Sequence, residues 1–250
     1  MRRVVTPELL VGLPATDPRA LRARADLRRV NFIMGNVGIR SRALLRHHDE
    51  TEFRSRPLRL VELGGGDGAV LLPLARSWSA RGVAAEVTLL DRQNLLSAET
   101  QHAFTALRWP VTSVATDVFT WLNEPAPAVD VMFANLFLHE FPEQPLGALL
   151  RLAARRTNLF IACEPRRSPL TLVGSHLLGL LGCSRVTRHD GVLSAHAGFA
   201  AAELSAHWPR VAGWELSEQP AGWFSHRFIA KRTAGSGADL SKHKLKPKTL

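Results

Sequence analysis

The sequence predicts an α/β protein built on a Rossmann-like, doubly wound and mostly parallel sheet of seven strands, with a small helical N-terminal cap. Three observations predict this fold. Short apolar runs alternate with helical patterns from residue 58 onwards, a glycine-rich segment directly follows the first run, and polar residues end five successive predicted strands. Ligands of open α/β sheets bind outside the carboxyl ends of the strands, so the pattern also predicts where the functional site lies.

The predicted strands are short apolar runs, as expected for strands that helices cover on both faces. They span residues 58–63, 86–90, 111–115, 129–134, 158–163, 214–218 and 223–230. Helical patterns lie between them, at residues 69–75, 95–107, 143–155, 169–181 and 199–206, whereas residues 187–197 are predicted to be a polar loop.

The chain is divided into a helical cap or lid at residues 1–56, a main domain at 57–232 and a flexible basic tail at 233–250. Prolines make the first residues irregular, but residues 20–48 carry apolar positions at helical spacing. We expect two short helices there, packed over the mouth of the main domain. Asn31 and Asn36 either mark the end of a helix or belong to a lid that reaches the cofactor or substrate.

Charge and cysteine content favour a soluble cytoplasmic protein. The net charge is +10, but all five lysines lie at position 231 or beyond, and the other 27 basic residues (32 − 5) are arginines scattered along the chain. Because this charge forms no focused patch, no nucleic-acid partner is favoured. Cys163 and Cys183 lack disulfide or metal spacing. We find no apolar segment with the length of a signal peptide or membrane span.

The glycine-rich segment carries the first chemical signal. A strand that runs through Gly64, Gly66 and Gly68 into a helix lets a ligand approach the backbone closely. Glu62, at the end of this strand, would repel a pyrophosphate but suits a ligand with an ammonium or sulfonium charge. A nicotinamide-dinucleotide loop is the alternative, because a glycine pattern alone is not specific.

The segment Glu62-Leu63-Gly64-Gly65-Gly66-Asp67-Gly68 resembles motif I, Glu-x-Gly-x-Gly-x-Gly, of the class I S-adenosylmethionine (SAM)-dependent methyltransferases. The run from Asn135 to Phe141 resembles motif IV in its Asn-x-x-Leu-His form. The resemblance covers residues 58 to about 230 and implies SAM as cofactor. It also implies that the last two strands form an antiparallel closing hairpin.

The predicted cofactor-binding residues lie in this segment and at the ends of the following strands. They are Glu62, Gly64, Gly66, Gly68, Asp91, Asp117, Val118 and Asn135. Asp91, 25 residues after Gly66, is placed to accept both hydroxyls of a ribose. The resemblance implies that Asp117 meets the adenine amino group. Glu164 ends the fifth predicted strand.

His139 is the predicted catalytic residue. A phenolic hydroxyl with a pKa near 10 must lose its proton at neutral pH, and an imidazole with a pKa of about 6.5 can accept it. Glu140 or Glu164 would orient the ring. The alternative is that His139 only packs against the cofactor, and His196 and His226 are weaker candidates for the base.

The sequence therefore predicts an enzyme, a SAM-dependent methyltransferase that acts on a small, partly apolar acceptor such as a phenol or polyketide-like hydroxyl. The apolar stretch at residues 170–183 and the cap would roof the acceptor pocket. No metal is expected, because no His/Cys/Asp constellation has metal-ligand spacing. The alternatives are an RNA or protein methyltransferase, and a non-catalytic or NAD-binding Rossmann module. Formation of a homodimer is left open.

Overall fold

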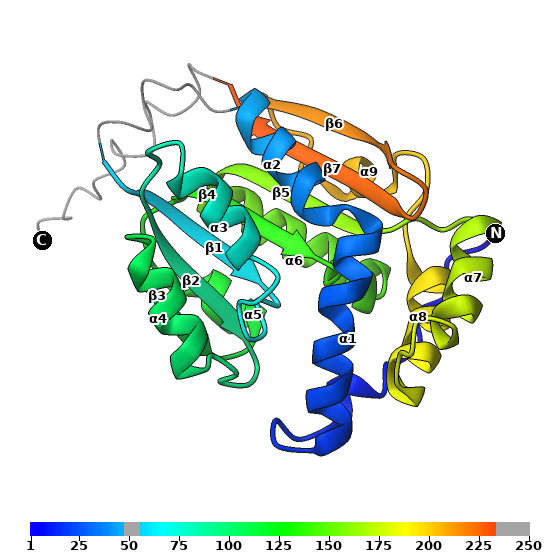
Figure 1. Ribbon diagram of the computed structural model, residues 1–250. Coiled ribbons are helices and arrows are strands. Elements are labelled where there is room, and N and C mark those ends of the chain that lie inside the picture. Colours follow the sequence, from blue (N-terminus) through cyan, green and yellow to red (C-terminus); the bar gives the residue numbers. More distant parts are fainter. Residues whose placement is uncertain (48–55, 234–250) are drawn as a thin grey trace, which may run out of the picture.

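Seven strands form a single sheet in the computed structural model, which describes residues 1–47 and 56–233 (Figure 1). The strand order is β3-β2-β1-β4-β5-β7-β6. The strands are β1 (Leu58–Leu63), β2 (Ala85–Asp91), β3 (Val111–Ala115), β4 (Val129–Asn135), β5 (Thr157–Pro165), β6 (Trp214–Ala221) and β7 (Ser225–Arg232). β1 to β5 are parallel, and β7 is antiparallel to both β5 and β6. The predicted sheet and its closing hairpin are confirmed.

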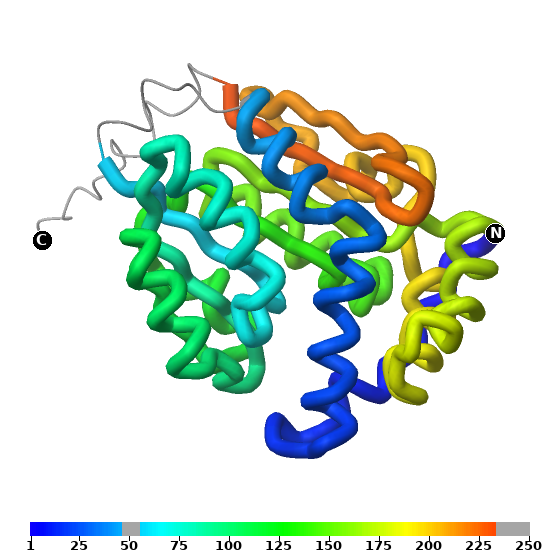
Figure 2. The backbone as a smooth tube through the Cα atoms, viewed as in Figure 1, coloured from blue at the N-terminus to red at the C-terminus, as the bar shows by residue number. Residues whose placement is uncertain are grey.

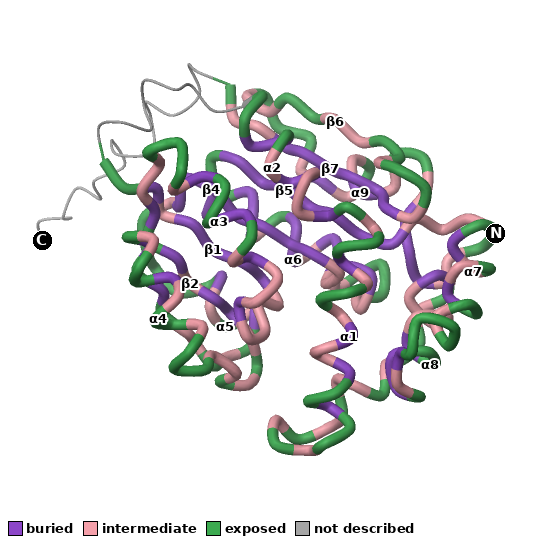
Figure 3. The backbone as a smooth tube through the Cα atoms, viewed as in Figure 1, coloured by how far each residue is buried: buried purple, intermediate pink, exposed green. Residues whose placement is uncertain are grey.

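Helices cover both faces of the sheet, as the tube in Figure 2 shows. One layer holds α2 (Asn36–His47), α3 (Leu72–Ser79) and α4 (Ala98–Ala106), and the other holds α5 (Val118–Asn123), α6 (Glu143–Arg156) and α9 (Glu203–His207). Because successive strand residues face opposite ways, Leu58 and Leu60 pack under the first layer while Val61 and Leu63 pack under the second. The strands are accordingly the most buried part of the chain (Figure 3).

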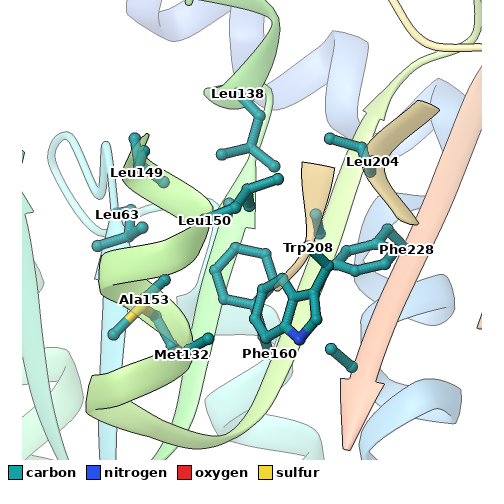
Figure 4. Close-up of a cluster of buried hydrophobic side chains, with 14 of the residues drawn as sticks. Leu63, Met132, Leu138, Leu149, Leu150, Ala153, Phe160, Leu204, Trp208 and Phe228 are labelled. Carbon is teal, nitrogen blue, oxygen red and sulfur yellow. The ribbon is translucent and has the colours of Figure 1, made fainter. Parts of the chain in front are cut away.

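The closing hairpin is held by an aromatic cluster under the second helix layer. Trp208, just after α9, packs against Phe160 of β5 and Phe228 of β7, with ring centroids 5.3 and 5.4 Å apart (Figure 4). All three side chains are almost completely buried. Burial of such large apolar groups is the main contribution to the stability of this end of the sheet.

The N-terminal segment contains the two expected helices, but only one of them lies outside the sheet layers. α1 (Pro18–Met34) begins after Asp17, whose carboxylate accepts a hydrogen bond from the Arg19 N–H, and ends at Gly35, which has a φ of 69°. The expected helix stop is therefore confirmed. α2 packs on the sheet itself, with Ala43 and Leu44 fully buried in the core. The expectation that both helices cover the mouth is wrong for α2, because its apolar face completes the first helix layer.

Three predicted segments near the C-terminus need correction. Residues 187–197, predicted to be a polar loop, belong to α8 (Arg185–Ala197), which begins at the Ser184 cap. The predicted helix at 199–206 shortens to α9, because Phe199 forms an isolated bridge with Arg166. The predicted helix at 169–181 divides into α7 (Pro169–His176) and the 3-10 turn η4 (Leu177–Gly179). Two further turns are η1 (Leu10–Gly12) and η3 (Leu138–Glu140).

Along residues 1–47 and 56–233, we find no helix with the length and apolar character that crossing a membrane requires. The predicted basic tail lies outside the described residues except for Thr233. The proposed division into cap and main domain stays a prediction.

Candidate functional site

The carboxyl ends of the parallel strands meet at one edge of the sheet. Leu63 at the end of β1 is in register with Leu90 on one side and Ala134 on the other, and Asn135 is in register with Cys163. The polar residues predicted to share this edge therefore do so. They are Glu62, Asp91, Asp117, Asn135 and Glu164.

The glycine loop after β1 has an open centre. Gly64, Gly66 and Gly68 have φ values of 64°, 54° and 74°, a left-handed conformation that side chains rarely adopt. A Cβ added to Gly66 would meet no atom of the described residues within 4 Å, whereas one on Gly64 would lie 2.4 Å from Phe137 Cδ2. Gly66 thus lies where a ligand can approach the backbone. At Gly64, the space for a side chain is taken by Phe137 rather than left open for a ligand.

Asp91 and Asp117 serve different local purposes. The Asp91 carboxylate accepts hydrogen bonds from the N–H groups of Gly66 and Gln93, both at 3.1 Å, so it fixes the glycine loop from the neighbouring strand. Asp117 is exposed and caps α5 by accepting from the N–H groups at positions 119 and 120. Val118 is 6% exposed and packs in the core.

Glu62 has a cationic partner from the chain itself. Its Oε1 lies 2.6 Å from the Arg40 Nη1, and both side chains are buried. Arg40 also donates to the Val70 carbonyl and lies over the Phe133 ring. Burial raises the pKa of Glu62, and the charge of Arg40 only partly offsets this. One oxygen of the carboxylate predicted to meet a ligand cation is therefore already paired with Arg40.

Three asparagines connect the N-terminal helices to the strand ends. The Asn31 Oδ1 accepts from the side-chain amides of Asn36 and Asn135, each at 2.9 Å. Asn36 in turn accepts from Cys163 and Ser225 through its Oδ1. Asn31 and Asn36 therefore anchor the N-terminal helices as part of a buried network, besides flanking the helix stop.

Two buried oxygens at this edge lack a hydrogen-bond donor among the described residues: Glu62 Oε2 and Asn135 Oδ1. A buried acceptor without a donor is costly. Both stand at the ends of adjacent strands, β1 and β4, so a ligand with N–H groups can satisfy them. This is the strongest sign that the edge is built to hold something.

His139 lies in η3 with its ring fixed by Glu164. Glu164 Oε2 is 2.8 Å from His139 Nδ1, and the same carboxylate accepts from the backbone N–H groups of Phe137, Leu138 and His139. These contacts hold a tight turn in which Leu136 has a φ of 51°. Of the two acids predicted to orient the imidazole, Glu164 is the one that does.

The other ring nitrogen of His139 contacts a residue that sequence reasoning missed. His139 Nε2 lies 3.2 Å from Glu8 Oε1, which also accepts from the Ser194 hydroxyl of α8. Burial alone would lower the pKa of His139, but the hydrogen bonds to Glu164 and Glu8 raise it to about 10. The imidazole is therefore charged at neutral pH in this structure, contrary to the expectation of an ordinary value near 6.5.

Neither alternative base candidate enters this cluster. His226 is buried against Glu218, with 2.8 Å between Nε2 and Oε1. His196 contributes its backbone carbonyl, which accepts from the Val4 N–H. Across the described ranges 1–47 and 56–233, no group of three or more His, Cys, Asp or Glu residues is arranged to hold a metal ion.

Arg40 and Glu8 are the two site residues without a recognisable sequence signal. Arg40 is one of many arginines in the chain, and Glu8 stands in a proline-containing stretch without periodicity. Arg40 acquires its role through Glu62 on β1, and Glu8 acquires its role through His139 in η3. No sequence spacing links either residue to its partner.

No family model and no curated protein matches the sequence, but solved structures share its fold. An O-methyltransferase family protein from Burkholderia thailandensis has a TM-score of 0.59 and 18% identity, over 88% of this chain and 62% of its own. The plantazolicin methyltransferase BamL was solved with a triazolic desmethylPZN analog and SAH. It has a TM-score of 0.60 and 13% identity, over 89% of this chain and 92% of its own. The mitomycin 7-O-methyltransferase MmcR has a TM-score of 0.54 and 17% identity, over 90% of this chain and 60% of its own. The chain has the fold of these methyltransferases and spans less than two thirds of the length of two of them.

Proposed function

We propose that the chain is an enzyme that uses SAM to methylate an oxygen of a small, partly apolar acceptor, preferably a phenol or polyketide-like hydroxyl. The observation that carries the proposal is the glycine loop after β1. Its Gly66 faces open space, and its backbone is fixed by Asp91 at the edge where buried acceptor oxygens lack donors. The three proteins of the same fold named above are methyltransferases, and BamL was solved with SAH.

The strand order argues against the alternative of a dinucleotide-binding module. The dinucleotide Rossmann sheet has the order 3-2-1-4-5-6 with parallel strands. Here the antiparallel strand β7 is inserted between β5 and β6. Glu62 adds to this, because a carboxylate at the end of β1, beside the loop, disfavours a pyrophosphate.

We assign the cofactor to the edge formed by Glu62, Gly66, Asp91 and Asn135. SAM carries an amino group with several N–H donors, which suits the unpartnered oxygens of Glu62 and Asn135. The Asp91 carboxylate suits the two hydroxyls of a ribose. When bound, SAM would supply a methyl group on a sulfonium; transfer to an acceptor oxygen would form an O–C bond as the C–S bond breaks in line and S-adenosylhomocysteine leaves.

In this proposal, His139 handles the proton of the acceptor. Because Glu164 holds Nδ1, Nε2 is the ring atom that can take a proton from a hydroxyl. With Glu8 also bound, the imidazole keeps its own proton at neutral pH. His139 can therefore act as a base only after Glu8 has left Nε2.

Aromatic side chains near His139 favour an apolar acceptor. Phe141, just after η3, packs edge-on against Phe137 and Phe119, with ring centroids 5.1 and 5.9 Å apart. All three rings are partly buried against the core under the second helix layer, and Phe137 also lies beside Gly64 of the glycine loop. The stretch at residues 170–183, predicted to roof a pocket, instead exposes Val173, Leu177 and Leu180 in this structure.

The proposal is tested by incubating the protein with methyl-labelled SAM and a panel of phenols that carry apolar chains of different length. We expect label in the phenol fraction, more of it with longer chains, and none with the matched amines. Gly66→Val is the matched control, because its new side chain fills the open centre of the loop. SAM binding without transfer to any phenol would refute the acceptor class. Absence of SAM binding would refute the enzyme.

A further inference from the structure

The first residues of the chain form an arm that lies across α8 and η3. The Arg3 guanidinium donates to the carbonyls of Ala197, His139 and Phe141 at 2.8, 3.2 and 2.9 Å. The Asp190 carboxylate of α8 accepts from the N–H groups of residues 9 and 10, both at 2.9 Å. Glu8 stands between these two anchors, so its side chain is directed at His139.

The Glu8 carboxylate occupies a prepared pocket. Its side chain is 14% exposed, and its Oε1 is bound by His139 Nε2 and by the Ser194 hydroxyl. Burial alone would raise the pKa of Glu8, but the hydrogen bond and charge of His139 outweigh it and lower the pKa. The pocket therefore holds an ionised oxygen at neutral pH.

We propose that His139 Nε2 and Ser194 Oγ form the subsite for the reacting oxygen of the acceptor, that this subsite takes an oxyanion, and that Glu8 fills it until the acceptor arrives. The inference rests on the proposed methyltransferase function. Nε2 is the ring atom directed away from Glu164, so an oxygen that exchanges a proton with His139 must come to the position of Glu8. Ser194 is thereby assigned to acceptor binding.

The charges around the pocket define the class of acceptor. His139 has Glu164 on its other nitrogen, and Glu140, next in the chain, has a pKa that burial raises to about 7. Other titratable and charged groups near the pocket are Arg3 at the His139 carbonyl, Arg92 near Glu140, His189 near Glu8, and Asp190, which accepts from the backbone N–H groups of residues 9 and 10. Replacing Glu8 by a phenolate, enolate or carboxylate leaves this balance unchanged. An amine in the same place would leave Nε2 of the imidazolium without an anionic partner, because Glu164 contacts only Nδ1.

The subsite is tested with acetate as the probe, while the His139 imidazole is followed by nitrogen NMR. In Glu8→Ala, the pKa of His139 should fall, and acetate should restore it saturably while chloride at equal ionic strength does not. Acetate should bind Glu8→Ala at least about tenfold tighter than wild type, because the tethered carboxylate no longer competes at its high local concentration. Ser194→Ala in the same background should lose about tenfold in acetate affinity.

Glu8→Gln keeps the shape of the arm and removes its charge, so it should also lower the pKa of His139. Glu143→Ala, which removes an 83% exposed carboxylate on α6, is the matched control and should change nothing. Equal acetate affinity in wild type and Glu8→Ala, or failure of acetate to restore the His139 pKa, would overturn the proposal. SAM binding, measured on the same samples, reports separately on the proposed function.

Discussion

The two sides of the candidate site are built from contacts of very different sequence separation. On the side of β1, β2 and β3, the Asp91 carboxylate accepts from the Gly66 N–H across 25 residues. Asp117 caps α5 by accepting from an N–H group two residues ahead. On the side of the N-terminal arm, Asn31 meets Asn135 across 104 residues, and Glu8 meets His139 across 131. The contacts of the first side join residues that belong to short, recognisable sequence patterns. The contacts of the second side form only when folding brings the N-terminal residues to the ends of the strands.

This difference decides which substitutions should change ligand affinity and which should change the stability of the fold. Residues of the glycine-loop side should change ligand affinity with modest effects on folding. Residues of the arm side, and the Arg40–Glu62 pair that joins α2 to β1, should change stability or the protonation of His139. The following predictions sharpen this contrast, in order of decreasing effect.

The largest expected effect is at Arg40. Arg40→Met leaves the Glu62 carboxylate buried without a cation, so the free energy of unfolding should fall by about 3–5 kcal/mol. Urea denaturation measures this change. In the double variant Arg40→Met/Glu62→Leu, most of the loss should be recovered, because no charge remains in the pocket. A single variant as stable as wild type would show that the ion pair is not needed.

Asp91→Ala should weaken SAM binding by about 1.5–3 kcal/mol, the usual contribution of hydrogen bonds to a charged group. Part of the loss reflects the freed glycine loop, because Asp91 also holds the Gly66 N–H. Calorimetric titration with SAM measures it. Unchanged affinity would remove Asp91 from the cofactor site.

Stability should fall with rising pH in the window where His139 titrates. A group whose pKa is raised in the folded state contributes stability below its unfolded pKa of about 6.5 and loses it as the pH approaches about 10. The slope for one proton is about 1.4 kcal/mol per pH unit, so roughly 2 kcal/mol should be lost between pH 7 and 8.5.

The control for this pH series is His139→Gln, in which the loss should be absent. Glu140 also has a raised pKa, so the stability that it contributes is lost as the pH rises from about 4.5 to about 7, below the window of His139. The chain contains no tyrosine, so the window below pH 9 is free of that titration. A wild-type stability that stays level from pH 7 to 8.5 would contradict a charged His139.

The smallest expected effect is at Asp117. Asp117→Ala removes the cap of α5 and should lower the free energy of unfolding by about 1 kcal/mol. Thermal unfolding checks the cap, and SAM titration of the same variant checks the adenine contact that the resemblance implies. Loss of stability without loss of SAM affinity would leave Asp117 with the structural role alone.

The sequence predicted the strands and their polar ends well, because each strand is a short local apolar run, whereas the closing hairpin was implied by the resemblance and α5 and α8 were not predicted. The error at α8 has a physical reason: residues 187–197 mix Thr, His, Asp and Ser with few large apolar groups, and the helix is fixed by its Ser184 cap and by contacts to α1 and α7. Asp26 of α1, for example, accepts from the Ser184 N–H at 2.7 Å. Glu8 was missed for the same reason, since its partners His139 and Ser194 lie in η3 and α8, 131 and 186 residues along the chain. Arg40 meets Glu62 only 22 residues away, but nothing in its pattern separates it from the other arginines.

The most direct test of the central claim is a calorimetric titration of the wild-type protein and Gly66→Val with S-adenosylhomocysteine, with NAD as the comparison ligand. If the glycine-loop side is a SAM site, wild type should bind S-adenosylhomocysteine and not NAD. Gly66→Val should lose this binding, because the new side chain enters the open centre of the loop and strains a backbone held at a φ of 54°. Binding of NAD alone, or equal binding of S-adenosylhomocysteine by both proteins, would contradict the account.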